Sequence, residues 1–365
     1  MAWDKKGAAA YLDRRMQWWS RWQSSALDHG TFCVSCHTAL PYALARTALD
    51  RTLSQSDVAP QARLLKDVRE RVRLWQQEGT YYTDADEPGK TEQSRGTEAV
   101  LNALILAWAD ASRGRLSDDA RTALDQMWAV QRTTGPDAGA WSWLDFGAAP
   151  WEARDSQYYG AALAALATGV APDGYRLLPQ VQNHLQLLRD YLDRRYPDAP
   201  LHHRLMALWA SAKLPGLLSS ERRQAVIDDI LRLQNSAGGW SLEALDPSER
   251  SRHALLQSSA SDGYATALAT LVLEQAAPAQ AAVHVRKGLR WLMANQQGHL
   301  GLWFRGRESF WVSRSLNKPR NPWSNVGRFM SDAATAYAVL ALTASVPSDR
   351  RLAATTTAVN AARRQ

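Results

Sequence analysis

The sequence predicts an all-α protein in which about six inner and six outer helices form a closed double ring, an α/α toroid. Two kinds of helix alternate along the 365 residues. One kind is apolar almost all round, as buried helices are. The other is amphipathic, with arginine, aspartate and glutamate on one face. The pairs recur at intervals of about 45 to 70 residues, which is typical of a repeat fold. We therefore expect a single domain over residues 1–365 with almost no strand.

The two sets of helices can be placed along the chain. The apolar helices are expected at 39–48, 97–109, 157–168, 203–212, 263–274 and 333–344. The amphipathic helices are expected at 7–23, 62–77, 118–131, 178–195, 221–233, 283–295 and 349–364. Apolar helices inside and amphipathic helices outside give the double ring.

Glutamine, glycine and tryptophan follow three of the amphipathic helices in a fixed order. Segments 234–240 and 297–303 match Gln-x-x-x-Gly-x-Trp, and Gln131 with Trp141 matches it with a four-residue insertion. These segments resemble the repeat motif of squalene–hopene cyclases, so the chain looks like a relative of the cyclase and prenyltransferase-like superfamily. The resemblance implies a toroid in which each glutamine ends an outer helix and stacks on the tryptophan.

The two cysteines of the chain stand close to a histidine. Cys33 and Cys36 are separated by two residues, and His37 directly follows. Cys-x-x-Cys-His resembles the attachment site of c-type cytochromes, where both thiols bond to haem and the histidine ligates iron. The resemblance implies haem c on Cys33 and Cys36, with His37 as an axial ligand, in an attachment segment 24–46. Two other interpretations remain open: zinc held by these residues with His29, and a disulfide or dithiol.

In a ring of helical hairpins all inner helices point the same way, so their N-terminal ends gather at one mouth. The candidate catalytic residues at this mouth are Asp262, Asp332 and Tyr158. For the two aspartates, helix N-capping is the competing interpretation. Arg95 and Arg154 are candidate cofactor-binding residues, because with the helix N-termini they favour an anionic group such as a haem propionate.

A second axial ligand to the iron could come from several side chains. The candidates are His29, His203, His253, Met16 and Met330. His203 begins an inner helix across the ring from His37, so we expect it to be the second metal ligand if the protein supplies one.

The chemistry of the resembled families is expected only in part. Terpenoid cyclases protonate an alkene with an aspartate of Asp-x-Asp-Asp-Thr-Ala, whereas segments 262–267 and 331–336 keep Thr-Ala and lack the paired acids that make a strong acid. No cysteine follows Cys36, so the zinc site of prenyltransferases is not expected.

Two classes of function follow. The first is a haem-c protein of the cell envelope, acting in electron transfer with a redox partner protein or as an oxidoreductase on a hydrophobic, for instance isoprenoid, substrate. The second is a haem-free terpenoid-cyclase-like isomerase or lyase, or a binding protein, in which Cys33 and Cys36 hold zinc or form a disulfide.

The charge and hydropathy of the chain restrict its partners. The net charge of +7 is spread along the chain without a block of lysine and arginine, so no nucleic-acid partner is expected. No apolar run approaches the roughly 18 residues that a transmembrane helix needs. Segment 1–7 is too polar for a signal peptide. Since haem c is attached outside the cytoplasm, we expect a periplasmic or otherwise exported protein whose leader has been removed.

Overall fold

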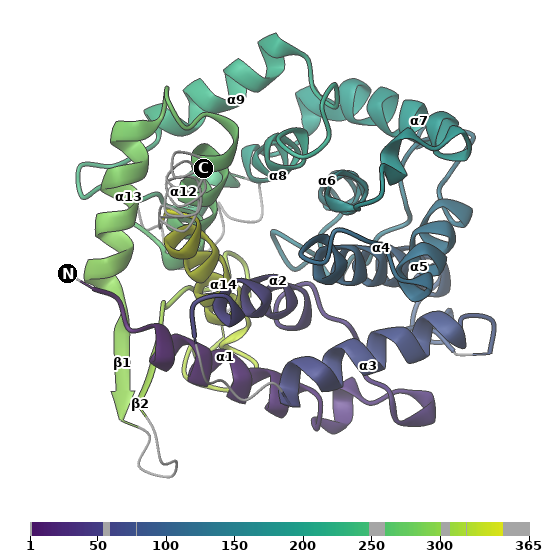
Figure 1. The fold of residues 1–365 in the computed structure, drawn as a ribbon, viewed down its shortest axis with the longest axis horizontal. Coiled ribbons are helices and arrows are strands. Elements are labelled where there is room, and N and C mark those ends of the chain that lie inside the picture. The colour runs from purple at the N-terminus through teal and green to yellow at the C-terminus, as the bar shows by residue number, and fades with distance from the viewer. Residues whose placement is uncertain are drawn as a thin grey trace, which may run out of the picture.

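The computed structural model describes residues 2–53, 59–77, 79–247, 260–300, 307–318 and 320–345 (Figure 1). Within these ranges the chain forms thirteen α-helices, four short 3-10 helices and one two-stranded sheet. The sheet is an antiparallel hairpin of β1 (Gln297–Leu300) and β2 (Arg307–Phe310). The all-α prediction is therefore confirmed. None of the described helices combines the length and apolarity needed to cross a membrane.

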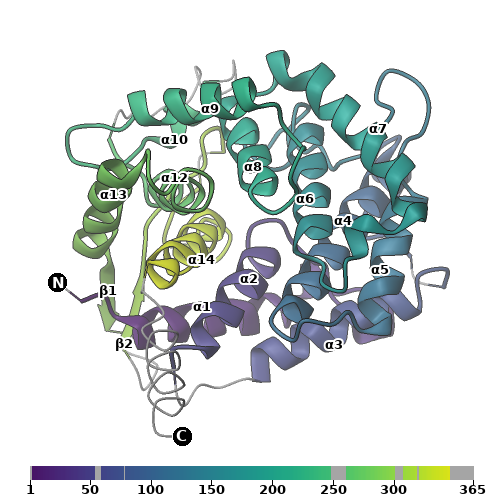
Figure 2. The same cartoon turned by 45° about the horizontal axis from the view of Figure 1, so that its top comes forward.

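Six helices form the interior, and each is buried on nearly every side. They are α2 (Ala39–Asp50), α4 (Lys90–Ala111), α6 (Gln157–Val170), α8 (Leu201–Ser211), α12 (Gly263–Ala276) and α14 (Phe329–Ala344). Each contacts the next in chain order, and α14 contacts α2, so the contacts run in a closed cycle (Figure 2). Every expected apolar helix is present. Three of them, α4, α8 and α14, begin earlier than the sequence predicted.

Amphipathic helices cover this interior. They are α1 (Lys5–Trp19), α3 (Ala59–Arg73), α5 (Asp118–Ala129), α7 (Pro179–Arg195), α9 (Ser220–Arg232) and α13 (Ala282–Asn295). Each packs on a neighbouring inner helix, and α1 contacts both α2 and α14. The short helix α10 (Leu242–Leu245) lies between α9 and α12. The helix expected at 349–364 lies outside the described residues.

Glutamines at the ends of α5 and α9 connect neighbouring outer helices. The Gln131 amide donates to the Gly139 carbonyl in its own turn and to the His184 carbonyl of α7, both at 3.1 Å. Gln234 makes the same kind of pair, reaching the His284 carbonyl of α13 at 2.9 Å. Gly139 has φ +100° and a Cβ there would meet backbone, so only glycine fits this turn. These hydrogen bonds connect α5 to α7 and α9 to α13.

Three buried tryptophans complete these turns. The indoles of Trp141, Trp240 and Trp311 each donate to a backbone carbonyl of the preceding outer helix, at 2.6 to 2.8 Å. Trp311 occupies the third place, where the sequence suggested Trp303. Trp303 itself lies outside the described residues.

The glutamine that connects helices in the third motif is one residue earlier than the sequence predicted. Gln297 begins strand β1, whereas Gln296 exchanges two hydrogen bonds with the backbone of Asp4, at 2.7 and 3.1 Å. The β-hairpin separates this glutamine from Trp311, which a pattern of fixed spacing cannot anticipate. Gln296 thereby links the end of α13 to the start of α1.

Candidate functional site

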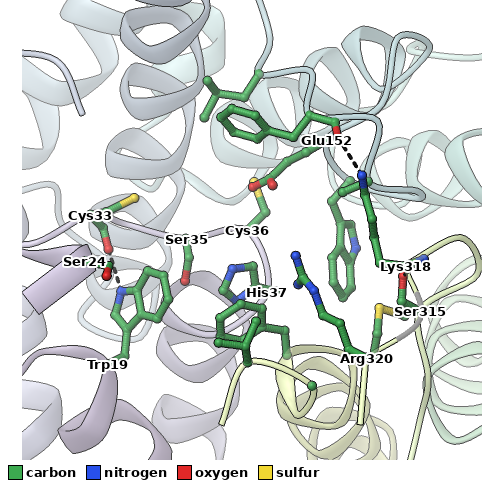
Figure 3. A pocket seen from close by; sticks show the side chains of 18 of the residues that line it. Trp19, Ser24, Cys33, Ser35, Cys36, His37, Glu152, Ser315, Lys318 and Arg320 are labelled. Atoms are coloured by element: carbon green, nitrogen blue, oxygen red, sulfur yellow. Dashed lines mark hydrogen bonds between the residues drawn. The ribbon is translucent and has the colours of Figure 1, made fainter. Parts of the chain in front are cut away.

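A cavity of about 320 Å³ lies at the N-terminal ends of the inner helices (Figure 3). Four segments surround it: those before α2, α4, α6 and α14. Its walls are mostly aromatic and aliphatic, with a few charged groups, as in sites for small molecules. Cys33, Cys36 and His37 all line it. The sequence motif therefore borders a cavity.

The backbone of the motif is held by bonds to neighbouring segments. The Cys33 amide donates to the Ser25 carbonyl at 2.8 Å, and the Cys33 carbonyl accepts from the Trp19 indole at 2.7 Å. The Ser35 hydroxyl accepts from the Thr38 and Ala39 amides and so caps the start of α2. Cys33 is half-buried, Cys36 is buried, and both are free thiols. The disulfide is therefore absent.

Glu152 faces the second cysteine. Its carboxyl group lies against the Cys36 thiol inside the cavity (Figure 3). Burial raises the pKa of Glu152 to about 7, against the opposing effect of Arg320. Burial and the nearby Glu152 carboxylate raise the pKa of Cys36 as well. Near neutral pH the Cys36 sulfur is thus a protonated thiol beside a carboxyl group that can gain or lose a proton.

The His37 ring is fixed between aromatic side chains. It stacks on Phe329 with 3.8 Å between centroids and meets Trp19 edge-on at 5.1 Å. Burial lowers the pKa of His37 well below its usual range, and the positive charges of Arg15 and Arg320 lower it further. The imidazole is therefore neutral and carries one unprotonated nitrogen.

A chain of hydrogen bonds identifies that nitrogen. The Thr38 hydroxyl donates to Asp332 Oδ2 at 2.8 Å. The oxygen of this Thr38 hydroxyl lies 2.9 Å from His37 Nδ1. Because a hydroxyl carries one hydrogen and Asp332 accepts it, Nδ1 of His37 must donate to Thr38. The proton therefore sits on Nδ1, and Nε2 keeps its lone pair for a metal.

Asp332 lies behind His37 and outside the cavity lining. It receives two hydrogen bonds from Arg15, at 2.7 and 2.9 Å, and one from the Tyr11 hydroxyl at 2.9 Å. Both partners of this ion pair are buried. The N-cap interpretation of Asp332 is wrong, because α14 begins three residues earlier, at Phe329. The carboxylate instead holds the Thr38–His37 pair in place.

Asp262 caps α12, as its position before that helix suggested. Its side chain accepts from the amides of Tyr264 and Ala265 at 2.8 and 3.0 Å. Burial raises its pKa to about 6, although the hydrogen bonds it accepts oppose that shift. Tyr158 packs on Tyr191 of α7, with 6.4 Å between ring centroids. Neither Asp262 nor Tyr158 lines the cavity.

The two arginines expected to bind the cofactor and the histidine expected as second metal ligand also lie outside the cavity lining. The Arg95 guanidinium sits over the Trp75 ring at 4.5 Å and lines a separate surface depression. Arg154 is exposed on the loop before α6. His203 is buried, and its Nε2 donates to the Pro150 carbonyl at 2.9 Å. None of the three lines the cavity.

The other candidates for a second axial ligand differ in position. Met330 lines the cavity, Met16 is buried in the core, and His29 is exposed. His253 lies outside the described residues. Among the described candidates, Met330 alone shares the cavity lining with His37.

Cations that the sequence analysis missed do reach the cavity. Arg314, Lys318 and Arg320 line it from the stretch before α14, and the Arg320 guanidinium lies beside His37 (Figure 3). Lys318 donates to the Phe146 carbonyl at 3.0 Å. The density of positive charge between 314 and 320 could have indicated an anion-binding segment. Nothing in the local sequence connects this segment to the Cys-x-x-Cys-His motif, which lies almost 300 residues away.

No group of three or more His, Cys, Asp and Glu side chains is arranged to hold a metal ion among the described residues. His29 is exposed and does not line the cavity with Cys33, Cys36 and His37. The four-ligand zinc arrangement is thus not assembled there.

Comparison with known proteins gives no assignment. No protein-family model matches the chain, and no curated protein is significantly similar to it.

Proposed function

We propose that this chain is a haem-c protein of the cell envelope built on an α/α toroid. The observation that carries the proposal is the state of His37, whose Nε2 lone pair is free at a cavity that both thiols also border. Two thioether tethers and one neutral imidazole are what haem c requires of a protein. Zinc could use the same thiols and imidazole, but a structural zinc site needs a fourth ligand, and His29 does not line this cavity.

The other residues of the cavity suit the same group. Its walls include Trp19, Trp151 and Phe329, which provide flat apolar surface for a porphyrin. Arg314, Lys318 and Arg320 supply positive charge for two propionates. Cys33 and Cys36 would hold the haem, and His37 would ligate its iron. When bound, haem supplies one-electron redox chemistry.

The chain's own residues have distinct tasks in this proposal. Asp332 and Thr38 orient His37 and increase the electron density of its imidazole. The aromatic walls exclude water, and the cations balance negative charge. We infer a role in electron transfer to a redox partner protein, or in oxidation of a hydrophobic substrate, outside the cytoplasm.

The closed cycle of inner helices and the glutamine–tryptophan connections support a toroid related in architecture to squalene–hopene cyclases. The haem-free cyclase alternative has less support, because Asp262 and Asp332 do not line the cavity. A proton donor to an alkene needs direct contact with its substrate.

The test is the absorption spectrum of protein exported in a host that attaches haem c. We expect a Soret band that survives acid–acetone extraction. Cys33→Ser combined with Cys36→Ser should abolish covalent haem, whereas His37→Ala should keep the tethers and change the iron spectrum.

His29→Ala provides the matched control, since His29 lies close in sequence but outside the cavity lining. This variant should have an unchanged spectrum. Full haem attachment in the double cysteine variant would overturn the proposal.

A further inference from the structure

A continuous line of aromatic rings runs from the haem-attachment cavity through the inner helices. Adjacent ring centroids along it are 5.2 to 6.4 Å apart, starting from His37. We call this line the axial aromatic chain; in order it consists of Trp151, Tyr264, Tyr337, Trp209 and Trp108. Every member is a side chain that can be oxidised by one electron.

The axial aromatic chain ends at a second cavity. Trp108 lines a space of about 440 Å³ formed by the C-terminal ends of inner helices, at the opposite end from His37. Arg51 and Lys213 line the same space. The axial aromatic chain therefore connects two cavities at opposite ends of the inner helices.

Near the His37 end of the axial aromatic chain, a buried tyrosine is hydrogen-bonded to a histidine. The Tyr264 hydroxyl lies 2.8 Å from His202 Nε2 and accepts from the Trp151 indole at 2.9 Å. If Tyr264 donates to His202, one buried polar hydrogen, on His202 Nδ1, has no partner among the described residues. If His202 Nε2 donated to Tyr264 instead, both the Tyr264 hydroxyl hydrogen and the His202 Nδ1 lone pair would lack a partner among the described residues. The tyrosine is therefore the donor.

This geometry suits proton-coupled oxidation. Removing an electron from a buried tyrosine is favourable only if its phenolic proton can move to a base. His202 is fully buried, and burial together with His203 lowers its pKa, so it is neutral and can accept. Oxidation would leave a neutral tyrosyl radical at Tyr264 and a protonated His202.

We propose that the axial aromatic chain carries electrons from a donor at the Trp108 cavity to an oxidant at the His37 cavity, with Tyr264 and His202 as its redox-active pair. The inference rests on the proposed haem site. Tryptophan and tyrosine are hard to oxidise, so the terminal oxidant would be a peroxide, for whose reduction bound haem would supply the redox chemistry. Converting one hydrogen peroxide to two waters takes two electrons and two protons. Two donor molecules each supply one electron, and the two protons come from solvent at the His37 cavity. The His202 proton returns to Tyr264 as each electron arrives.

The donor's chemistry follows from the second cavity. Arg51 and Lys213 place positive charge beside Trp108, which favours a small one-electron donor with an anionic group. The aromatic chain would keep such a donor apart from the peroxide.

The test replaces haem by a photo-oxidant, so that its result does not depend on haem attachment. In the Cys36→Ser protein, a thiol-reactive ruthenium photosensitiser is attached to Cys33, which is half-buried at the cavity. A light flash with an electron-accepting quencher then creates the oxidant in place. We expect a tyrosyl radical in the electron paramagnetic resonance spectrum, formed more slowly in deuterated solvent.

Tyr264→Phe keeps the ring and should lose this radical. Tyr191→Phe is the matched control, because Tyr191 is also buried but lies on outer helix α7 and is not a member of the axial aromatic chain. An undiminished radical in folded Tyr264→Phe protein would overturn the proposal.

Trp151→Phe provides an independent test if the first variant does not fold. It interrupts the chain between the label and Tyr264, so the tyrosyl signal should again be lost. Its persistence would also overturn the proposal. In the haem-loaded protein, peroxide should produce the same radical. If the exported protein acquires no haem but passes the photochemical test, only the haem assignment is refuted.

Discussion

Replacing Thr38 by valine tests whether the hydrogen bonds behind His37 exist. The change removes the hydroxyl that accepts from His37 Nδ1 and donates to Asp332, while keeping a side chain of similar shape. A buried N–H without an acceptor costs about 1 to 3 kcal/mol, and a bond to a charged group contributes about 1.5 to 3 kcal/mol. Asp332 keeps its bonds from Arg15 and Tyr11, so the second loss is partial. We expect a total loss of roughly 2 to 4 kcal/mol.

The assay is urea unfolding of haem-free protein, followed by far-ultraviolet circular dichroism. Thr38→Val should lower the midpoint without changing the slope, which is the mark of a change in stability alone. Thr38→Ser is the control, because it keeps the hydroxyl and loses one methyl group, worth about 1 kcal/mol. Equal destabilisation by the two variants would refute the hydrogen-bonded arrangement.

The same variant makes a second prediction in the haem-loaded protein. Hydrogen bonding of Nδ1 toward an anionic group makes the imidazole a stronger electron donor, which favours the oxidised iron. Thr38→Val should therefore raise the midpoint reduction potential, and Thr38→Ser should leave it close to the wild-type value. A lower potential in the valine variant would contradict this reasoning.

Other residues give further predictions. Trp240→Ala and Trp311→Ala should each cost roughly 3 to 5 kcal/mol in urea unfolding, because both indoles are fully buried. Glu152 has a folded-state pKa of about 7, above its ordinary 4.5, so the folded state binds more protons between these values. Its contribution to stability is therefore present at low pH and lost as pH rises toward 7, and Glu152→Gln should flatten that slope in unfolding measured across pH. Arg320→Gln should raise the pKa of His37 in an NMR titration, since Arg320 helps to lower it.

Each of these predictions has a result that would contradict it. Phenylalanine at 240 or 311 should destabilise less than alanine, so equal effects would mean that burial of the ring is not the cause. An unchanged pH slope in Glu152→Gln would show that this carboxyl group titrates normally. A fixed His37 pKa in Arg320→Gln would place the guanidinium farther from the ring.

The inner helices could be predicted from sequence because their signal is local. The segment from Gly263 onward is apolar on all sides, and Asp262 before it is a typical cap, so its start was placed correctly. The ends that extend past the apolar residues were missed, as at Lys90 in α4 and Phe329 in α14. Polar first turns carry no burial periodicity, so nothing in the pattern marked them as helical.

The surroundings of His37 could be predicted only in part. Cys-x-x-Cys-His is a contiguous signal, and its cysteines and histidine all border the cavity. The side chains that hold His37 are distant in sequence, since Arg15 and Asp332 are 317 residues apart. Asp332 was considered as an acid or a cap, because its arginine partner leaves no local trace.

These distances connect the site to closure of the helix cycle. Arg15 comes from α1, Thr38 directly precedes α2 and Asp332 comes from α14, so the hydrogen bonds behind His37 form only when the last inner helix meets the first two helices of the chain. Without α14, Arg15 would lose its buried carboxylate, and an unpaired buried charge is strongly unfavourable. His37 would also lose Phe329, which stacks on its ring. The same contacts that close the cycle therefore orient His37, so the orientation of this ring and the completed fold should be gained and lost together.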